Sequence, residues 1–331
     1  MTDSASPGKS QLRLATRNGE ALVAQAAREG KHVALAPDAS LDDACIAILG
    51  GCRALFQRHA AELERSCDVE AIHQLRVALR RLRAFLGLLK TIAPGEERES
   101  LAAEAKEIAG AMGPARDLDV FCEALRRDLN PLLDHEPGLC ALLDAAEAKR
   151  FEAQGAARAA LTSDAARRFE ADLDAFISRR PWRGEGSDEP GSARVFAVKA
   201  LRRSRRRALR SFEGLAQASP EQLHRARIAV KKARYAAELF ADLFATAQRK
   251  TYARGLAKIQ DRLGEANDRT TAERLLDEIV DARPALAPAR AALSRLRAAG
   301  PGLETTKPKR WTRKLRGLEP FWRAEEAEET Q

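Results

Sequence analysis

The sequence predicts an all-α protein that contains an internal duplication. Its 331 residues are 45% hydrophobic and 32% charged with only 5% aromatics, and they are rich in alanine, leucine, arginine and glutamate, all strong helix formers. The stretch AIHQLRVALRRLRAFLGLLK at residues 71–90 recurs as LHRARIAVKKARYAAELF at residues 223–240, without a gap, at an offset of 151 (224 − 73). Apolar residues recur at helical spacing in both copies.

Proline, glycine and polar clusters divide the chain into four parts. Residues 1–36 are predicted to be an N-terminal extension, partly disordered, and residues 303–331 a C-terminal tail. The first half spans 37–183 and the second 184–302, because PWRGEGSDEPGS at 181–192 has the composition of a linker. Helices are expected at 41–65, 71–90, 101–112, 118–133 and 139–180, the last with a possible break near 155 or 162, and then at 198–210, 223–240, 252–263, 268–281 and 284–298.

The duplicated helix carries a basic stripe beside its apolar face. At about 100° per residue, the four basic positions of each copy fall within about 80° of one another. No Asp or Glu occurs between residues 71 and 95 or between 222 and 237. Solvated helix faces usually mix charge signs, so the repeated, unpaired stripe favours the binding of an extended polyanion over an ordinary solvated surface. The candidate residues are His73, Arg76, Arg80 and Arg83, and His224, Arg227, Lys231 and Arg234.

A second basic segment, VKALRRSRRRALR at residues 198–210, opens the second half. Like charges at this density destabilise a helix unless an anion or an acidic surface neutralises them. Similar runs also occur in nuclear signals and in nonspecific nucleic-acid arms. Because this run is predicted to lie beside the second stripe, we expect it to contribute to the same polyanion site through Lys199, Arg202, Arg203, Arg206 and Arg210.

A glycine and an aspartate follow the third predicted helix of each half. Gly113 and Gly264 suit the left-handed residue that ends a helix. Asp117 and Asp268 suit the N-cap or first turn of the next helix. The alternative is that each aspartate orients a histidine or arginine of the basic helix.

Charge and cysteine content restrict the class of protein. A net charge of +9 indicates an anionic partner. The sequence has no apolar run near the roughly 20 residues that a membrane span needs, and residues 1–20 lack the apolar core of a secretory signal, so a cytoplasmic location, with polyphosphate granules as one site, is expected. The cysteines form an odd set without a C-x-x-C pair, which predicts reduced core residues rather than metal ligands or disulfides. They are Cys45, Cys52, Cys67, Cys122 and Cys140.

Four motifs in order resemble the CHAD family, the conserved histidine α-helical domain. They are IHQLRVALRRLR at 72–83, GPARDLDV at 113–120, LHRARIAVKKARYAAELF at 223–240 and LGEANDR at 263–269. The resemblance extends from about Leu41 to Ala298. It implies two tandem four-helix bundles related by a pseudo-twofold axis, with a basic groove between them that binds inorganic polyphosphate, often at polyphosphate granules. It also adds Lys106 and Lys258 as candidate contacts. The chain departs from the family pattern at Ala226, Ala233 and Asn267.

The expected function is therefore noncatalytic polyphosphate binding, with no catalytic residue, metal or cofactor. One alternative is a nucleic-acid-binding helical protein, but the basic helices offer only Phe85 and Tyr235 for base stacking. Another is a phosphohydrolase or phosphotransferase that uses His73 or His224. That chemistry needs metal-binding carboxylates near the phosphates, and the basic helices contain none.

Overall fold

The computed structural model describes residues 34–66, 68–129, 137–183, 191–214, 219–244, 247–299 and 308–323. Within these ranges every regular element is a helix, which confirms the all-α class. None of the described helices combines the length and hydropathy of a membrane-spanning segment. The helices are α2 (Leu41–Arg65), α3 (Val69–Leu89), α4 (Glu96–Ala111), α5 (Gly113–Leu129), α6 (Pro137–Leu161), α7 (Asp164–Arg179), α8 (Ala193–Ser211), α9 (Pro220–Leu239), α10 (Gln248–Ala282), α11 (Ala287–Ala299) and α12 (Pro308–Arg316).

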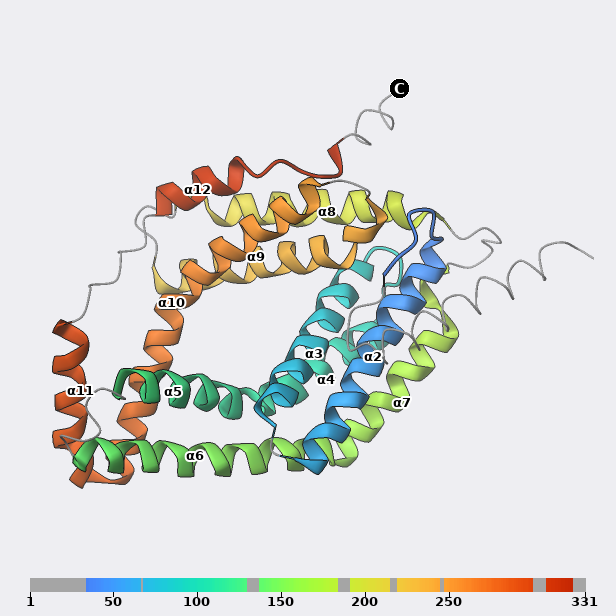
Figure 1. The fold of residues 1–331 in the computed structure, drawn as a ribbon. Coiled ribbons are helices and arrows are strands. Elements are labelled where there is room, and N and C mark those ends of the chain that lie inside the picture. The colour runs from blue at the N-terminus through green and yellow to red at the C-terminus, as the bar shows by residue number, and fades with distance from the viewer. Residues whose placement is uncertain are drawn as a thin grey trace, which may run out of the picture.

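The predictions for residues 1–33 and for the end of the tail after Arg323 lie outside the described residues. Figure 1 shows α8, α9 and α12 side by side along one edge of the molecule and α5 and α6 along the opposite edge. Helices α2, α3, α4 and α7 group at one end of this arrangement, and α10 connects the two edges at the other end, next to α11.

The two halves begin in the same way and contact each other there. Ser40 caps α2 and Ser192 caps α8, each by accepting a backbone N–H from the third residue beyond it. The two serines pair as an isolated antiparallel bridge, and the Leu41 N–H donates to the Gly191 carbonyl at 2.6 Å. The first helix of one half is therefore held directly against the first helix of the other.

The two-bundle prediction implied a separate hydrophobic core in each half. The structure differs, because each of its two cores contains helices of both halves. The larger core joins α2, α3, α4 and α7 to α8, α9, the first part of α10 and the C-terminal segment. A smaller core joins α5 and α6 to the second part of α10 and α11. The buried face of α9 is rich in alanine, including Ala226 and Ala233, and such small side chains let a neighbouring helix approach closely.

The helix end predicted near Gly113 is present, because α4 stops at Ala111, but the end predicted at Gly264 is wrong, and neither glycine has the predicted left-handed conformation. Gly113 begins α5 directly after Met112, and α10 continues through Gly264 without a break. Within the described ranges, only Gly95 and Gly214 among the glycines have a positive φ. A difference in sequence explains why only the first copy breaks: Pro114, which has no N–H to continue α4, is replaced by Glu265 in the second copy.

The start of the predicted linker is packed against the first half. Residues Pro181–Arg183 form a short 3₁₀ helix in which Trp182 is buried and donates its indole N–H to Asp42 at 2.9 Å. Arg180 donates to the same carboxylate at 2.8 Å. The long helical stretch before it breaks after Leu161, at the second of the two places that the sequence suggested.

Candidate polyanion site

Helix α3 presents its basic stripe beside a fully buried apolar face. Its Asp68 N-cap accepts the Glu70 N–H at 2.9 Å and fixes where the helix starts. Arg76 reaches α4 and donates a hydrogen bond from Nη1 to the Ala109 carbonyl. Arg80 donates from Nε to the Arg76 carbonyl, one turn earlier, at 3.0 Å. These bonds keep two half-buried guanidinium groups in fixed places next to the core.

The stripes of α3 and α9 meet at Lys231. Burial and, to a smaller extent, the positive charges of Arg227, Arg80, Arg234 and Arg76 together lower the pKa of Lys231 to about 8. Arg76 and Arg80 belong to α3, whereas the other residues belong to α9. We call these five residues the central basic cluster. The sequence predicted each stripe, and the structure brings them together.

A glycine lies next to an arginine of the basic helix at equivalent places in the two halves. A Cβ atom on Gly113 would lie 3.4 Å from Arg76 Nη1, and one on Gly264 would lie 4.0 Å from Arg227 Nε. The Nε atoms of Arg76 and Arg227 are buried without a hydrogen-bond partner. The contact is closest at Gly113, where an added methyl group would touch the guanidinium group, whereas Gly264 has room for a Cβ atom at ordinary contact distance.

Asp117 and Asp268 face the cluster from inside helices, so they are not N-caps. Burial raises the pKa of Asp117, and the charge of Asp268 raises it as well, while Arg76 and Arg274 lower it. This electrostatic coupling places the two aspartates near one another and Asp117 near Arg76. Asp117 thus acts on Arg76 through its charge, and the alternative in which an aspartate orients an arginine of the basic helix stays a prediction.

The two histidines of the repeat lie in different surroundings. His73 is half-buried, whereas His224 is exposed. Burial lowers the pKa of His73, and Arg116 lowers it further against the raising effect of Glu70. His73 is therefore neutral at pH 7. Arg116 therefore belongs to the electrostatic environment of the site.

Arg83, Lys106 and Lys258 are predicted contacts outside the central basic cluster, and one member of the cluster, Arg234, has an acidic partner. Arg83 is half-buried, and burial lowers its pKa. Arg234 forms an ion pair with Glu238 at 3.5 Å, a partner that lies one residue beyond the acid-free window of the sequence. Lys106 is exposed on α4. Lys258 is exposed on α10 and lowers the pKa of Lys314 on α12, a smaller effect than that of burial, so it lies near the C-terminal segment.

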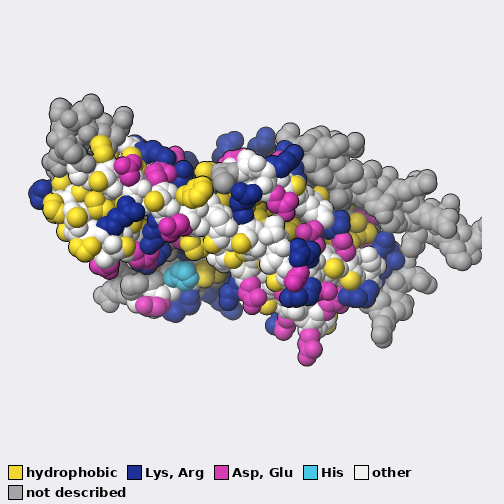
Figure 2. All heavy atoms as spheres, turned by 90° about the horizontal axis from the view of Figure 1, so that it is seen from below, with side chains coloured by type: hydrophobic (Ala, Val, Ile, Leu, Met, Phe, Trp, Pro, Cys, Tyr) yellow, Lys and Arg dark blue, Asp and Glu magenta, His cyan; other side chains and the backbone are white. Residues whose placement is uncertain are grey.

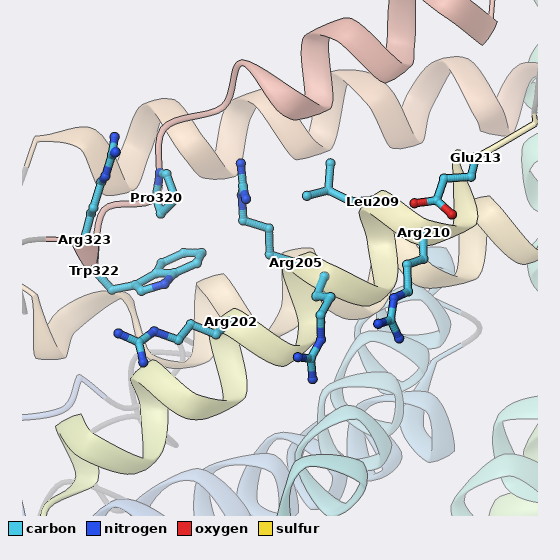
Figure 3. Close-up of a pocket in the computed structure, with 9 residues that line it drawn as sticks. Arg202, Arg205, Leu209, Arg210, Glu213, Pro320, Trp322 and Arg323 are labelled. Carbon is cyan, nitrogen blue, oxygen red and sulfur yellow. The ribbon is translucent and has the colours of Figure 1, made fainter. Parts of the chain in front are cut away.

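The predicted basic face of α8 is divided. Arg202, Arg206 and Arg210 line a pocket of about 610 Å³ together with residues of the C-terminal segment (Figure 3). Lys199 and Arg203 do not line it. None of the four arginines with the largest effects on the pKa of Lys231 comes from α8. The sequence grouped α8 with the stripes, and the structure associates its arginines with the tail.

The face seen in Figure 2 provides a contrast. It is viewed from below Figure 1, and its Lys and Arg side chains alternate with Asp and Glu over most of the visible surface. Such mixing is typical of an ordinary solvated surface. The central basic cluster differs from this face because basic side chains from two helices, α3 and α9, lie close together and are half-buried.

The two similar basic helices define this chain as an all-α protein with a candidate polyanion site. Direct comparison with known proteins gives the family. A sequence profile of the CHAD domain matches residues 47–277, and the chain belongs to this family.

The crystal structure of the CHAD domain from the plant Ricinus communis is similar to this chain, with 29% identity and a TM-score of 0.73 over 87% of this chain and 96% of that one. PptA from Streptomyces chartreusis is 20% identical, with a TM-score of 0.49 over 78% of this chain and 99% of that one. No curated protein matches the chain.

Proposed function

We propose that this protein is a noncatalytic binder of inorganic polyphosphate and that the central basic cluster is its main binding site. The depressed pKa of Lys231, about 8, is the observation that carries the proposal. Several positive charges from both copies surround a half-buried ammonium group, and their repulsion is unfavourable until an anion neutralises it. A phosphate chain does this at many points at once.

The chemistry of the cluster fits a phosphate polymer. Arginine is permanently charged, and its planar fork can donate two hydrogen bonds to one phosphate. Arg76 to Arg83 spans about 10 Å along α3 at 1.5 Å per residue, so the stripe can follow several consecutive phosphates without reading any sequence. Membership of the CHAD family supports polyphosphate as the ligand, because polyphosphate binding is what the resemblance to this family implies.

The remaining candidates take secondary places in this proposal. His73, Arg83 and His224 contact phosphates at the ends of the two stripes, and Lys106 and Lys258 attract the chain from exposed positions. Lys199 and Arg203 act on α8 in the same way. Binding of granular polyphosphate would bring the protein to polyphosphate granules in the cytoplasm.

Charge reversal at one residue of each stripe tests the proposal. The double variant Arg80→Glu/Lys231→Glu should lose at least about 100-fold in affinity for immobilised long polyphosphate at moderate salt. The control Arg225→Glu/Lys232→Glu makes the same change in net charge at two exposed positions of α9 and should lose less than about fivefold. Equal loss in the two double variants would contradict a localised site.

Two further measurements separate polyphosphate binding from the alternatives. RNA of equal total charge should compete poorly against long polyphosphate, because the cluster lacks the stacking aromatics typical of single-strand recognition. Incubation of the purified protein with polyphosphate and Mg²⁺ should release no phosphate above background. Rapid release that His73→Gln abolishes would indicate an enzyme instead.

A further inference from the structure

We propose that the pocket between α8 and the C-terminal segment is a second anion site, which takes a compact small molecule that carries several phosphate groups. This inference does not depend on polyphosphate binding at the central basic cluster. The pocket has a volume of about 610 Å³. Its basic lining residues, which we call the α8–tail arginines, are Arg202, Arg205, Arg206, Arg210 and Arg323.

Aromatic packing holds the tail side of the pocket in place. The Phe321 ring lies 5.2 Å from that of Phe244 and 5.7 Å from that of Tyr252. The Trp322 ring lies 5.1 Å from that of Tyr252 and 4.9 Å from that of Phe321. These edge-to-face contacts fix Phe321 and Trp322 against Phe244 and the first part of α10, so the Trp322 ring forms a built wall of the pocket.

A close fit one turn earlier strengthens the same attachment. Leu318 packs onto Gly255 of α10 so tightly that a Cβ atom on this glycine would collide with the leucine methyl groups. Arg205 also connects the two sides, because its Nη2 donates to the Arg316 carbonyl at 3.3 Å. Figure 3 shows Arg205 rising from α8 toward the C-terminal segment.

An unpaired donor inside this wall indicates a missing acceptor. Trp322 is only 1% exposed, and its indole Nε1 is buried without a hydrogen-bond partner. The ring lies above Arg202 in Figure 3 and lines the pocket. Buried polar groups in folded proteins almost always have a partner, so an unpaired N–H next to a cavity favours an acceptor-rich ligand there.

The charge and size of the pocket narrow the ligand class. Five arginines and one carboxylate, Glu213, line the pocket, and Arg323 also pairs with Glu319 at 3.9 Å, so basic groups outnumber acidic ones there. All the guanidinium and indole groups are donors only, which suits phosphate oxygens. Pockets of about 300–1,000 Å³ typically hold small molecules, whereas a long polymer needs an extended surface. A small molecule that carries several phosphates fits both the basic, donor-only lining and the size of the pocket.

The test uses the full-length chain with Arg80→Glu/Lys231→Glu, so that the central basic cluster no longer contributes. Titration calorimetry with tripolyphosphate, ATP and inositol hexakisphosphate should show one site per chain for at least one of these probes. Adding Arg206→Ala and Arg210→Ala should weaken that binding about 100-fold, roughly tenfold for each charged hydrogen-bond donor.

Matched variants show whether the probes bind in the pocket itself. Arg207→Ala removes one charge from an exposed position of α8 outside the pocket and should change affinity less than about twofold. Trp322→Phe keeps a ring but removes the N–H and should weaken binding roughly threefold to tenfold.

Absence of binding for all three probes, or equal affinity of the Arg206→Ala/Arg210→Ala and Arg207→Ala chains, would overturn the second site. The probe that binds most tightly identifies the source of the phosphates: an inorganic chain, a nucleotide or an inositol. Retention of long polyphosphate by the otherwise unmodified chain is measured separately, so failure of either proposal is distinguishable from failure of the other.

Discussion

The two copies of the basic helix have the same spacing of charges but different environments. In the first copy, Arg76 is bonded to α4 and His73 is half-buried. In the second copy, His224 is exposed and Lys231 lies in the positive potential of both helices. The two copies therefore share the pattern of charges without sharing the role of each position.

The difference between the copies teaches that the site depends on both. The first copy fixes its charges by hydrogen bonds to backbone carbonyls, whereas the second contributes the group on which the charges converge. We therefore expect substitutions in either copy to weaken polyphosphate binding. The pH dependence of affinity and the free energy of unfolding should differ between variants of the first copy and variants of the second.

The largest expected effect comes from salt. Raising the salt concentration from 50 to 200 mM should weaken polyphosphate binding by about 100-fold or more if five or six cations contact the chain. Arg80→Ala and Lys231→Ala should each reduce the slope of log K against log salt by about 0.7 to 0.9. If only one of the two variants changes the slope, the site belongs to one copy alone.

The second prediction concerns proton uptake at Lys231. Its pKa of about 8 in the free protein should rise when an anion binds, so complex formation at pH 8 should take up about half a proton. Affinity should fall by up to about tenfold per pH unit as the pH rises above 8. Calorimetry in buffers of different ionisation enthalpy measures the uptake, and Lys231→Arg should abolish it.

Removing the Lys231 charge should stabilise the free protein. Because its folded pKa lies below the unfolded value of 10.5, protonation of Lys231 opposes folding at neutral pH, and the free energy of unfolding rises between about pH 8 and 10.5. Lys231→Met should therefore raise stability at pH 7 by roughly 1–2 kcal/mol, after allowance for solvent screening, and weaken polyphosphate binding.

Chemical denaturation at pH 7 and at about pH 10 measures this effect, since the gain should disappear at the higher pH. Lys232→Met, at the exposed neighbouring position, serves as the control and should stay within about 0.5 kcal/mol of the parent at both values. Equal stabilisation by the two variants would contradict the crowding of charge at Lys231.

The histidines should separate the two copies by pH. A nearby phosphate raises the lowered pKa of His73, so polyphosphate binding should tighten roughly threefold as the pH falls from about 7 to 5.5. His73→Gln should remove more of this change than His224→Gln, because His224 is exposed and solvent screens its contact with phosphate more strongly. Affinity that stays constant over this range would exclude direct phosphate contact by His73.

The smallest expected effect distinguishes the two glycines. Gly264→Ala adds a methyl group inside α10 at ordinary contact distances, 3.8 Å from Asp268 and 4.0 Å from Arg227, and should stabilise the protein by about 0.5–1 kcal/mol. Gly113→Ala places the same group 3.4 Å from Arg76 Nη1 at the start of α5 and should gain little. Thermal melts of both variants would settle the comparison.

The sequence by itself determined the all-α class, most helix positions and the content of each basic stripe. These features are local, because helical spacing alone decides which side chains share a face and which residue caps an end. The sequence also contains the reason for the helix break at Pro114 and for the continuous helix at Glu265. The glycine shared by the two copies led to the prediction of a helix end in both.

Only the tertiary structure decided which faces meet. It places Lys231 beside Arg76 and Arg80, and it places α8 arginines next to Trp322 from the far end of the chain. Local spacing cannot decide this, because the partner of each helix depends on the apolar surface that every helix can bury against the others. The charges then lie wherever that packing places them.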